Sequence, residues 1–195
     1  MSLPPDLTDR AALARNRARA LARGAELFLH EDAAAEAKER LSEVNKTFTK
    51  PAVVAVFPGP WREILPDARI IADDEVLALE EGAHDLVIHA LSLHWANDPV
   101  GQLIQCRRAL RPDGLFLGVM FGGQTLAELR AALAEAESRL TGGLSPRVLP
   151  MAEIRDLGAL LQRADFALPV ADAVKRTVTY ATMFHLIADL RAMGE

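Results

Sequence analysis

The apolar residues of this chain fall into short continuous runs and into longer stretches with helical spacing. The short runs are rich in Val, Ile and Leu and are bounded by proline, glycine or charged residues, which is typical of buried strands. We predict strands at residues 51–57, 68–72, 85–91 and 115–120, and a closing strand pair at 166–170 and 176–180. Apolar residues three or four positions apart predict helices at residues 9–23, 25–44, 99–110, 125–140, 151–163 and 181–193.

The first predicted helix has signals at both ends. Thr8 is a candidate N-cap because its hydroxyl oxygen can accept from a free amide at the helix start, and Gly24 suits the backbone geometry that ends a helix. We expect the residues before Leu7 to be disordered. The segment between the first two strands holds three prolines, so we expect only a turn or two of helix at residues 60–65.

The order of the elements predicts the fold class. The strands at 85–91 and 115–120 are separated by one helix and a Pro-Asp-Gly turn, which makes a βαβ unit with parallel, right-handed connection. Strands that alternate with helices give an α/β sheet with helices on both faces. We therefore expect one domain over residues 1–195, with an N-terminal helical segment at 1–48 and the sheet and its helices at 51–195.

Composition and charge limit the classes of partner expected for this chain. The net charge of −5 and the pI near 5.6 argue against nucleic acid as the main partner. A basic segment is interpreted as a solvated helical face in preference to a targeting or lipid-binding role; it contains Arg10, Arg15, Arg17, Arg19 and Arg23. The apolar runs are too short for a membrane span. The single cysteine, Cys106, excludes an internal disulfide and is interpreted as a buried structural thiol. We expect a cytoplasmic protein.

Several motifs resemble those of one protein family. They are residues 91–98 (LSLHWAND), 110–114 (LRPDG), 119–130 (VMFGGQTLAELR), 156–158 (DLG) and 193–195 (MGE). Together they resemble the class I, type 11-like S-adenosylmethionine-dependent methyltransferases, in the branch related to a mitochondrial respiratory complex I assembly factor. The resemblance implies a Rossmann-like methyltransferase fold with a mostly parallel sheet, added N-terminal helices and S-adenosylmethionine as cofactor.

The chain departs from this family in the cofactor half. The family places a glycine-rich loop after the first strand, whereas this chain has Phe57-Pro58-Gly59-Pro60-Trp61, in which the two prolines have no N–H to donate. One strand and its helix are missing from the expected order. In the remaining register Asp73 matches the carboxylate that accepts from the adenine amino group, and Asp74 its neighbour beside the ring. The resemblance thus implies a cofactor site containing Phe57, Gly59, Asp73, Asp74 and His89.

The catalytic candidates are His94 and Trp95, which follow the third strand, where sites of α/β folds gather. They could serve as a general base and an aromatic wall, or both could pack the junction of strand and helix. His89 lies in an apolar strand and also suits a hydrogen-bonded core position. The histidines and the lone cysteine do not have metal-ligand spacing, so we expect no metal site.

Two functions follow. One is an S-adenosylmethionine-dependent methyltransferase-like protein with a degenerate cofactor loop, acting on a small molecule or a protein. The alternative is a non-catalytic methyltransferase-fold binding or assembly protein linked to respiratory complex I. A homo-oligomeric scaffold is a third reading. Fold alone does not separate them, because activity belongs to the site.

Overall fold

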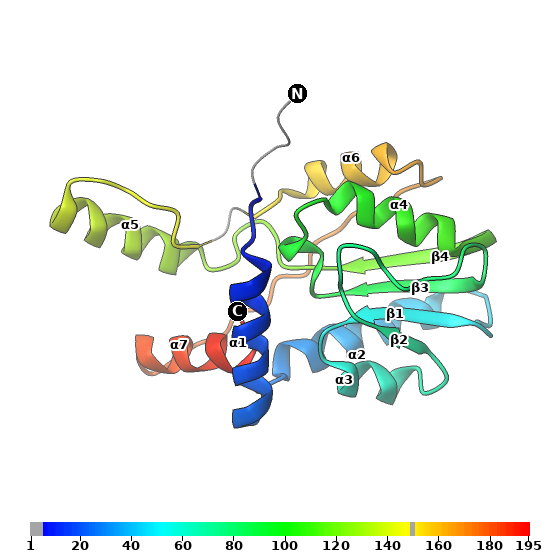
Figure 1. Ribbon diagram of the computed structural model, residues 1–195, viewed down its shortest axis with the longest axis horizontal. Helices are drawn as coiled ribbons and strands as arrows, with labels where there is room; N and C mark the ends of the chain where they lie inside the picture. Colours follow the sequence, from blue (N-terminus) through cyan, green and yellow to red (C-terminus); the bar gives the residue numbers. More distant parts are fainter. Residues whose placement is uncertain (1–5, 149–150) are drawn as a thin grey trace.

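The computed structural model describes residues 6–148 and 151–195, so the disorder expected before Leu7 lies largely outside the described residues. The described residues form a four-stranded sheet in the order β2-β1-β3-β4, and all neighbouring strands are parallel (Figure 1). The strands are β1 (Pro51–Ala55), β2 (Arg69–Ile71), β3 (His84–Ala90) and β4 (Leu110–Val119). The predicted α/β class and parallel sheet are confirmed.

The helices lie close to their predicted positions. They are α1 (Arg10–Arg23), α2 (Phe28–Glu43), α3 (Pro58–Ile64), α4 (Pro99–Ala109), α5 (Ala127–Thr141), α6 (Ile154–Arg163) and α7 (Met183–Ala192), with a 3-10 turn, η1 (Leu93–Trp95), after β3. None of the helices in the described ranges is long and apolar enough to cross a membrane.

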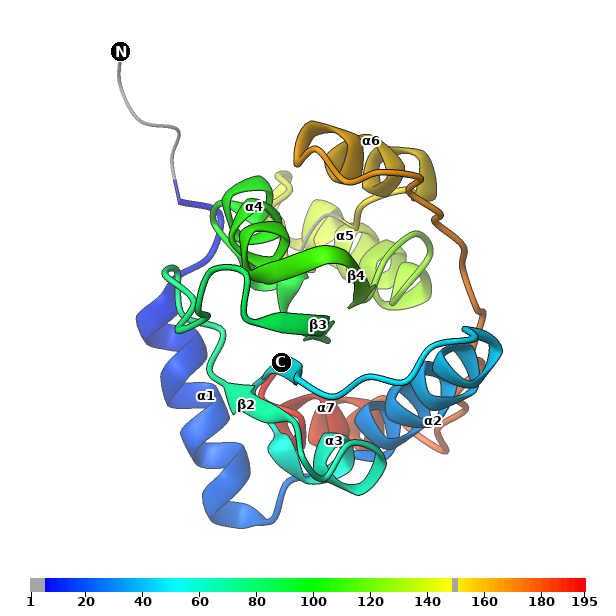
Figure 2. The same ribbon diagram turned by 90° about the vertical axis from the view of Figure 1, so that its right-hand side faces the viewer.

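The core has two layers because successive strand residues point to opposite faces of the sheet. Val53 and Ile88 face one side, where they pack with buried residues of α2 and α3. Val54 and Val87 face the other side and pack with Cys106 of α4. Figure 2 shows α2 and α3 below the sheet and α4 and α6 above it. Both faces of β1 and β3 are therefore covered, as a parallel sheet requires.

The start of α1 differs from the prediction. Asp9, not Thr8, is the N-cap, and its carboxylate accepts a hydrogen bond from the amide of Ala12 at 2.9 Å. Thr8 is buried and is used differently, because its backbone N–H donates to the side chain of Asn97 at 2.8 Å. Gly24 ends the helix as expected, with φ of 87°.

The predicted closing strand pair is wrong. Residues 166–180 contain no strand. Leu168 is left-handed with φ of 50° and is followed by Pro169, which has no N–H for a ladder, so the first run cannot stay extended and paired. Leu168 and Val170 are 92% and 85% exposed, so the apolar pattern that suggested a buried strand does not correspond to burial.

Candidate functional site

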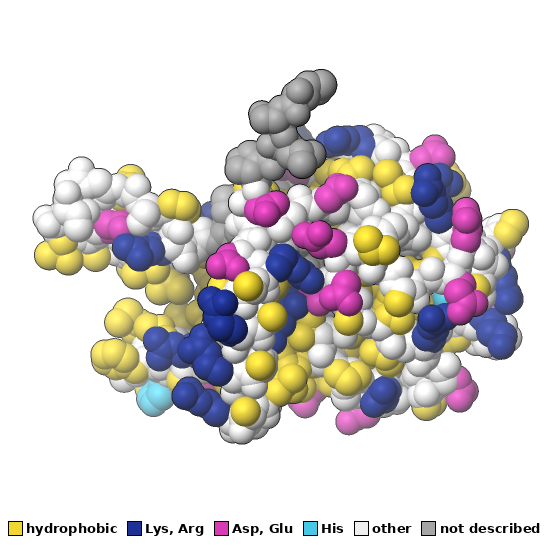
Figure 3. Space-filling view, viewed as in Figure 1, with side chains coloured by type: hydrophobic (Ala, Val, Ile, Leu, Met, Phe, Trp, Pro, Cys, Tyr) yellow, Lys and Arg dark blue, Asp and Glu magenta, His cyan; other side chains and the backbone are white. Residues whose placement is uncertain are grey.

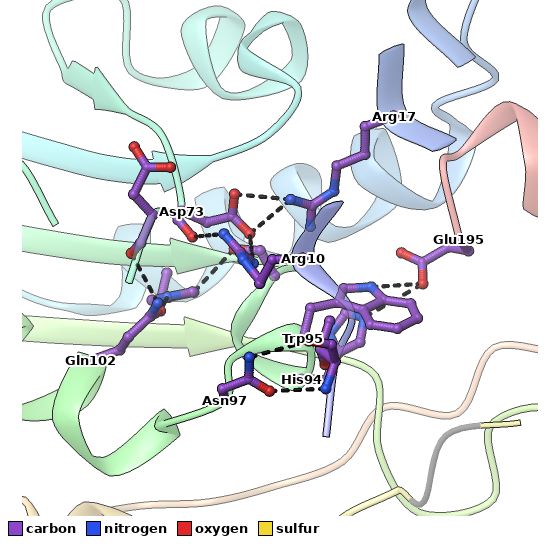
Figure 4. Close-up of polar contacts among 12 residues, drawn as sticks. Arg10, Arg17, Asp73, His94, Trp95, Asn97, Gln102 and Glu195 are labelled. Carbon is purple, nitrogen blue, oxygen red and sulfur yellow. Dashed lines mark hydrogen bonds and ion pairs between the residues drawn. The ribbon is translucent and has the colours of Figure 1, made fainter. Parts of the chain in front are cut away.

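The candidate site lies at the carboxyl ends of the strands, where α1 and α7 pack against each other (Figure 1). Asp73 and Asp74 follow β2, and Ser92, His94 and Trp95 follow β3. Because all four strands are parallel, these ends meet at one edge of the sheet. Helix α1 covers this edge, and Figure 4 shows the polar contacts that it makes there.

Asp73 is held by two arginines of α1. Its carboxylate oxygens lie 2.9 and 3.0 Å from Nη1 of Arg17, and one of them lies 3.4 Å from Nη1 of Arg10. Arg10 also donates to the backbone carbonyl of Asp73 at 2.5 Å. The side chains of Arg17 and Asp73 are only 12% and 8% exposed. We call this group of three residues the Asp73 clamp.

The clamp corrects the interpretation of the basic segment as a solvated face. In a helix with 3.6 residues per turn, positions seven apart point in nearly the same direction, so Arg10 and Arg17 share one side of α1. Arg19 and Arg23 are four apart, point away from that side and are exposed. The arginines thus lie on two faces of α1: Arg10 and Arg17 pack against Asp73, whereas Arg19 and Arg23 are exposed to water.

The beginning of α1 is anchored as well. The side-chain oxygen of Asn97 accepts from the Thr8 amide at 2.8 Å, and its amide nitrogen donates to the Thr8 carbonyl at 3.2 Å. Asn97 follows η1, so this pair joins the N-terminus of α1 to the loop after β3. The helix is therefore tied to the sheet edge by the pair of Thr8 and Asn97 and by the Asp73 clamp.

Asp74 and His89 belong to a second network. His89 is completely buried, its Nε2 donates to the Gln102 side-chain oxygen at 2.7 Å, and its Nδ1 lies 3.4 Å from the Ser92 hydroxyl. The Gln102 amide donates to the backbone carbonyl of Asp74 at 3.1 Å. Burial lowers the pKa of His89 to about 4, so the ring is neutral at pH 7. In this arrangement His89 is a hydrogen-bonded core residue that fixes the loop after β2.

His94 and Trp95 contact the end of the sequence. The Trp95 indole donates to Oε2 of Glu195 at 2.9 Å, and Nε2 of His94 lies 3.6 Å from the same oxygen. The His94 side chain is 4% exposed and packs edge-on against Phe121, with ring centroids 5.2 Å apart. Neither ring nitrogen of His94 has a hydrogen-bond partner among the described residues, so His94 stays a prediction as general base.

Phe57 and Gly59 lie at the start of α3. Phe57 is buried beneath His30 of α2, with the two rings edge-to-face at 5.0 Å. Burial lowers the pKa of His30 to about 4. Gly59 is the second residue of α3, and a Cβ built there meets no atom within 4 Å. Nothing approaches this glycine closely, so the position does not form the cradle that a glycine-rich loop provides.

The sequence reasoning missed the residues that close this site. Arg17, Gln102 and Glu195 were not predicted as site residues, although they contact Asp73, Asp74 and Trp95. Asn97 was not predicted either, and it contacts Thr8 before α1. The seven-residue spacing of Arg10 and Arg17 is a signal that was present in the sequence. Asn97 and Glu195 lie in motifs that carry the family resemblance, residues 91–98 and 193–195, but neither motif indicates which contact the residue makes. Gln102 lies in no such motif. Among the described residues there is no cluster of three or more His, Cys, Asp or Glu that could hold a metal ion.

Comparison with known proteins places the chain in a family. The family model described as "Methyltransferase domain" matches residues 11–118, more than half of the chain. This range contains the first three strands, all of α1 except Arg10 and all of β4 except Val119. The chain belongs to this methyltransferase family.

The relatives point to one branch of it. The chain is 47% identical over 131 residues to the mitochondrial arginine-hydroxylase NDUFAF5 of Mus musculus and 46% identical to that of Homo sapiens. It is 36% identical over 127 residues to the malonyl-[acyl-carrier protein] O-methyltransferase of Laribacter hongkongensis. The first match covers 67% of this chain, and the chain spans only 38% of the mouse protein. The expected relationship to this branch is confirmed.

A solved structure and the compartment of the relatives give two further findings. A solved SAM-dependent methyltransferase from Thermotoga maritima is 14% identical, has a TM-score of 0.49 and aligns over 72% of this chain and 75% of its own. The expectation of a cytoplasmic protein is contradicted by the NDUFAF5 relatives of four vertebrates, which are named as mitochondrial. A lone buried cysteine fits any reducing compartment, so it did not justify that choice.

The methyltransferase domain implies S-adenosylmethionine as the cofactor. The site in the present arrangement does not fit it. The resemblance assigns Asp73 to the adenine amino group, but its carboxylate oxygens accept from Arg10 and Arg17. At the position of the methionine end, Pro58 and Pro60 have no N–H, and Gly59 lies within a helix.

Proposed function

We propose that this chain is a non-catalytic binding protein with a methyltransferase fold, and that its own helix α1 occupies the position of the cofactor. The proposal treats residues 1–195 as one domain and assigns Phe57, Gly59, Asp73, Asp74 and His89 to the degenerate cofactor position. Its partner is a protein of the respiratory complex I pathway, which is supported by the identity of 47% to NDUFAF5. Self-association of the chain is a separate proposal that oligomeric state would test.

The Asp73 clamp is the observation that carries this proposal. A cofactor that used Asp73 would have to replace two charged donors, and the arginines would lose a carboxylate that is almost fully shielded from water. Breaking a buried pair of this kind costs about 3 kcal/mol. Since 1.4 kcal/mol corresponds to a factor of ten, the cofactor would bind roughly a hundredfold more weakly than at an open site.

Calorimetric titration with S-adenosylmethionine and with S-adenosylhomocysteine tests the proposal. We expect no binding to the wild-type chain at ligand concentrations of about 1 mM, and no rise in melting temperature, because a ligand stabilises only a protein that it binds. A dissociation constant below about 0.1 mM for either ligand would contradict the proposal.

A second function remains supported by one observation. Asp73 follows β2 at the position that the resemblance assigns to the adenine contact, and in the described residues its hydrogen bonds to α1 come from the side chains of Arg10 and Arg17. The chain would then be a methyltransferase that binds its cofactor when α1 moves away, with His94 as candidate base and Trp95 as an aromatic wall. Its substrate would be a small molecule or a protein group.

The double variant Arg10→Ala/Arg17→Ala separates the two functions. If α1 is a movable cover, freeing Asp73 should strengthen cofactor binding at least about tenfold. If the site is degenerate, the roughly hundredfold gain from removing the clamp should still leave binding undetectable at about 1 mM, because the prolines after β1, which have no N–H to donate, are unchanged. Arg139→Ala/Arg155→Ala removes the same charge from exposed positions on α5 and α6 and should behave as the wild type in both cases.

A further inference from the structure

A groove lies on the outer side of the contact between α1 and α7. It has a volume of about 670 Å³, within the range of small-molecule sites. Its walls carry Arg19 and Arg23 of α1 and Arg191 of α7, and its floor contains alanines of both helices. Figure 3 shows basic side chains gathered over the lower half of α1 beside α7. The groove is distinct from the Asp73 clamp, which occupies the opposite side of α1.

The guanidinium groups that line this groove can contact a ligand. In the described part of the chain, no ion pair involves Arg19, Arg23 or Arg191, and all of them are exposed. Arg19 contacts only neighbours on its own helix, the side chain of Asn16 and the carbonyl of Arg15. The guanidinium groups therefore keep donors that face the groove or water.

One acidic residue lines the groove, and it is already engaged. Oε2 of Glu195 accepts from the Trp95 indole at 2.9 Å and lies 3.6 Å from His94. The local charge is therefore positive although the whole chain has a net charge of −5. A concentration of positive charge on an acidic protein attracts an anion to that place.

We propose that this groove binds a phosphate-bearing ligand. Guanidinium groups recognise phosphate oxygens through paired, charge-assisted hydrogen bonds, and one phosphate group offers enough oxygens for several arginines at once. The alanine floor leaves room for a small apolar portion of the ligand next to the charged group. The phosphate belongs to a soluble organic phosphate or to a phospholipid headgroup, and both offer the same chemistry to the arginines.

Pyrophosphate titration and vesicle sedimentation test this site and its ligand source. The indole of Trp95 donates a hydrogen bond to Glu195, which lines the groove, so we use tryptophan fluorescence to follow ligand binding in the groove. We expect saturable binding of pyrophosphate that weakens as salt is raised. In parallel, the chain is sedimented with neutral phosphatidylcholine vesicles and with vesicles that also contain phosphatidylglycerol.

The variant Arg19→Ala/Arg23→Ala/Arg191→Ala should lose at least about tenfold in affinity. Arg155→Ala, an exposed arginine of α6, should bind as the wild type. If the triple variant does not fold, Arg191→Ala alone serves, since this residue is exposed.

The outcomes distinguish the two sources of phosphate and show whether the groove binds phosphate at all. Saturable pyrophosphate binding that depends on the arginines supports a soluble phosphate. Sedimentation only with anionic vesicles, lost in the variant, supports a lipid headgroup. Absence of both kinds of binding, or binding that the triple variant retains in full, overturns the proposal.

Discussion

Arg17 donates from one guanidinium nitrogen to both carboxylate oxygens of Asp73, at 2.9 and 3.0 Å, although 56 positions separate the two residues in the chain. This contact joins the first helix to the end of β2, at the edge of the sheet where α/β folds bind ligands. It gives the N-terminal helix a fixed place over the sheet and uses the carboxylate that the sequence resemblance predicts to contact a cofactor.

Loss of the clamp should destabilise the fold. In Arg17→Ala the Asp73 carboxylate keeps only the longer contact to Arg10, so we expect a loss of about 1–3 kcal/mol in the free energy of unfolding. Urea titration followed by circular dichroism measures it. Arg139→Ala, which breaks an exposed pair with Glu135, should cost no more than about 0.5 kcal/mol. Equal losses in the two variants would show that the clamp is no stronger than a surface ion pair.

Acid should weaken the fold through two histidines. Burial lowers the pKa of His30 and of His89 from 6.5 to about 4. Between these values the unfolded chain binds protons that the folded chain does not, so their contribution is complete at pH 7 and is lost as the pH falls from about 6.5 towards 4. We expect each histidine to cost about 2 kcal/mol at pH 5 relative to pH 7, measured by urea unfolding at both values.

Substitution identifies the source of this pH dependence. His30→Gln and His89→Gln should each reduce the difference between pH 7 and pH 5, because glutamine does not titrate. His185 is exposed on α7, and His185→Gln should leave the difference unchanged. If neither buried substitution alters the difference, other groups cause it.

Gly194 should be intolerant of a side chain. Its φ of 79° suits glycine, and an added Cβ would lie 2.9 Å from Cγ and 3.1 Å from Cα of Arg17. We expect Gly194→Ala to cost about 1–3 kcal/mol, or to release the neighbouring Glu195 from Trp95 and change the fluorescence of the indole. Gly143→Ala is the matched control, because nothing lies within 4 Å of its added Cβ. A stable Gly194→Ala variant with unchanged fluorescence would contradict this packing.

Cys106 should be chemically silent in the folded protein. Its side chain is fully buried in α4, and burial raises the pKa of the thiol to about 12, so almost no thiolate exists at pH 8. Under native conditions we expect Ellman's reagent to label the thiol only at the rate of global unfolding. In about 6 M guanidinium, which exceeds the unfolding midpoint of nearly all domains, we expect rapid labelling. Fast labelling under native conditions would show that α4 opens locally.

Much of the sheet could be predicted because its strands are continuous apolar runs. β1 and β3 are buried on both faces, and such strands carry an unbroken signal. The start of β4 was placed too late. Leu110 already pairs with His84, and the ladder then shifts across the Pro-Asp-Gly turn before Leu115 pairs with Leu86. A turn inside a strand has the sequence of a boundary, so periodicity does not reveal it.

The candidate site was less predictable because it is built from long-range polar contacts. The sequence indicated Asp73, His89, His94 and Trp95, and all of them lie at or near the carboxyl edge of the sheet. Their partners, such as Gln102, come from other elements and carry no local pattern. An arginine that lies inside the protein and one that faces water look the same in a sequence, since helix spacing shows which residues share a face but not what that face contacts.

The clamp also constrains the length of α1. One residue inserted between Arg10 and Arg17 would turn them apart by about 100° and leave only one of them over Asp73. A homologue that keeps the aspartate but has lost this seven-residue interval is thus expected to expose the carboxylate to an incoming nucleoside. The register of a single surface helix would then distinguish sealed members of the family from open ones.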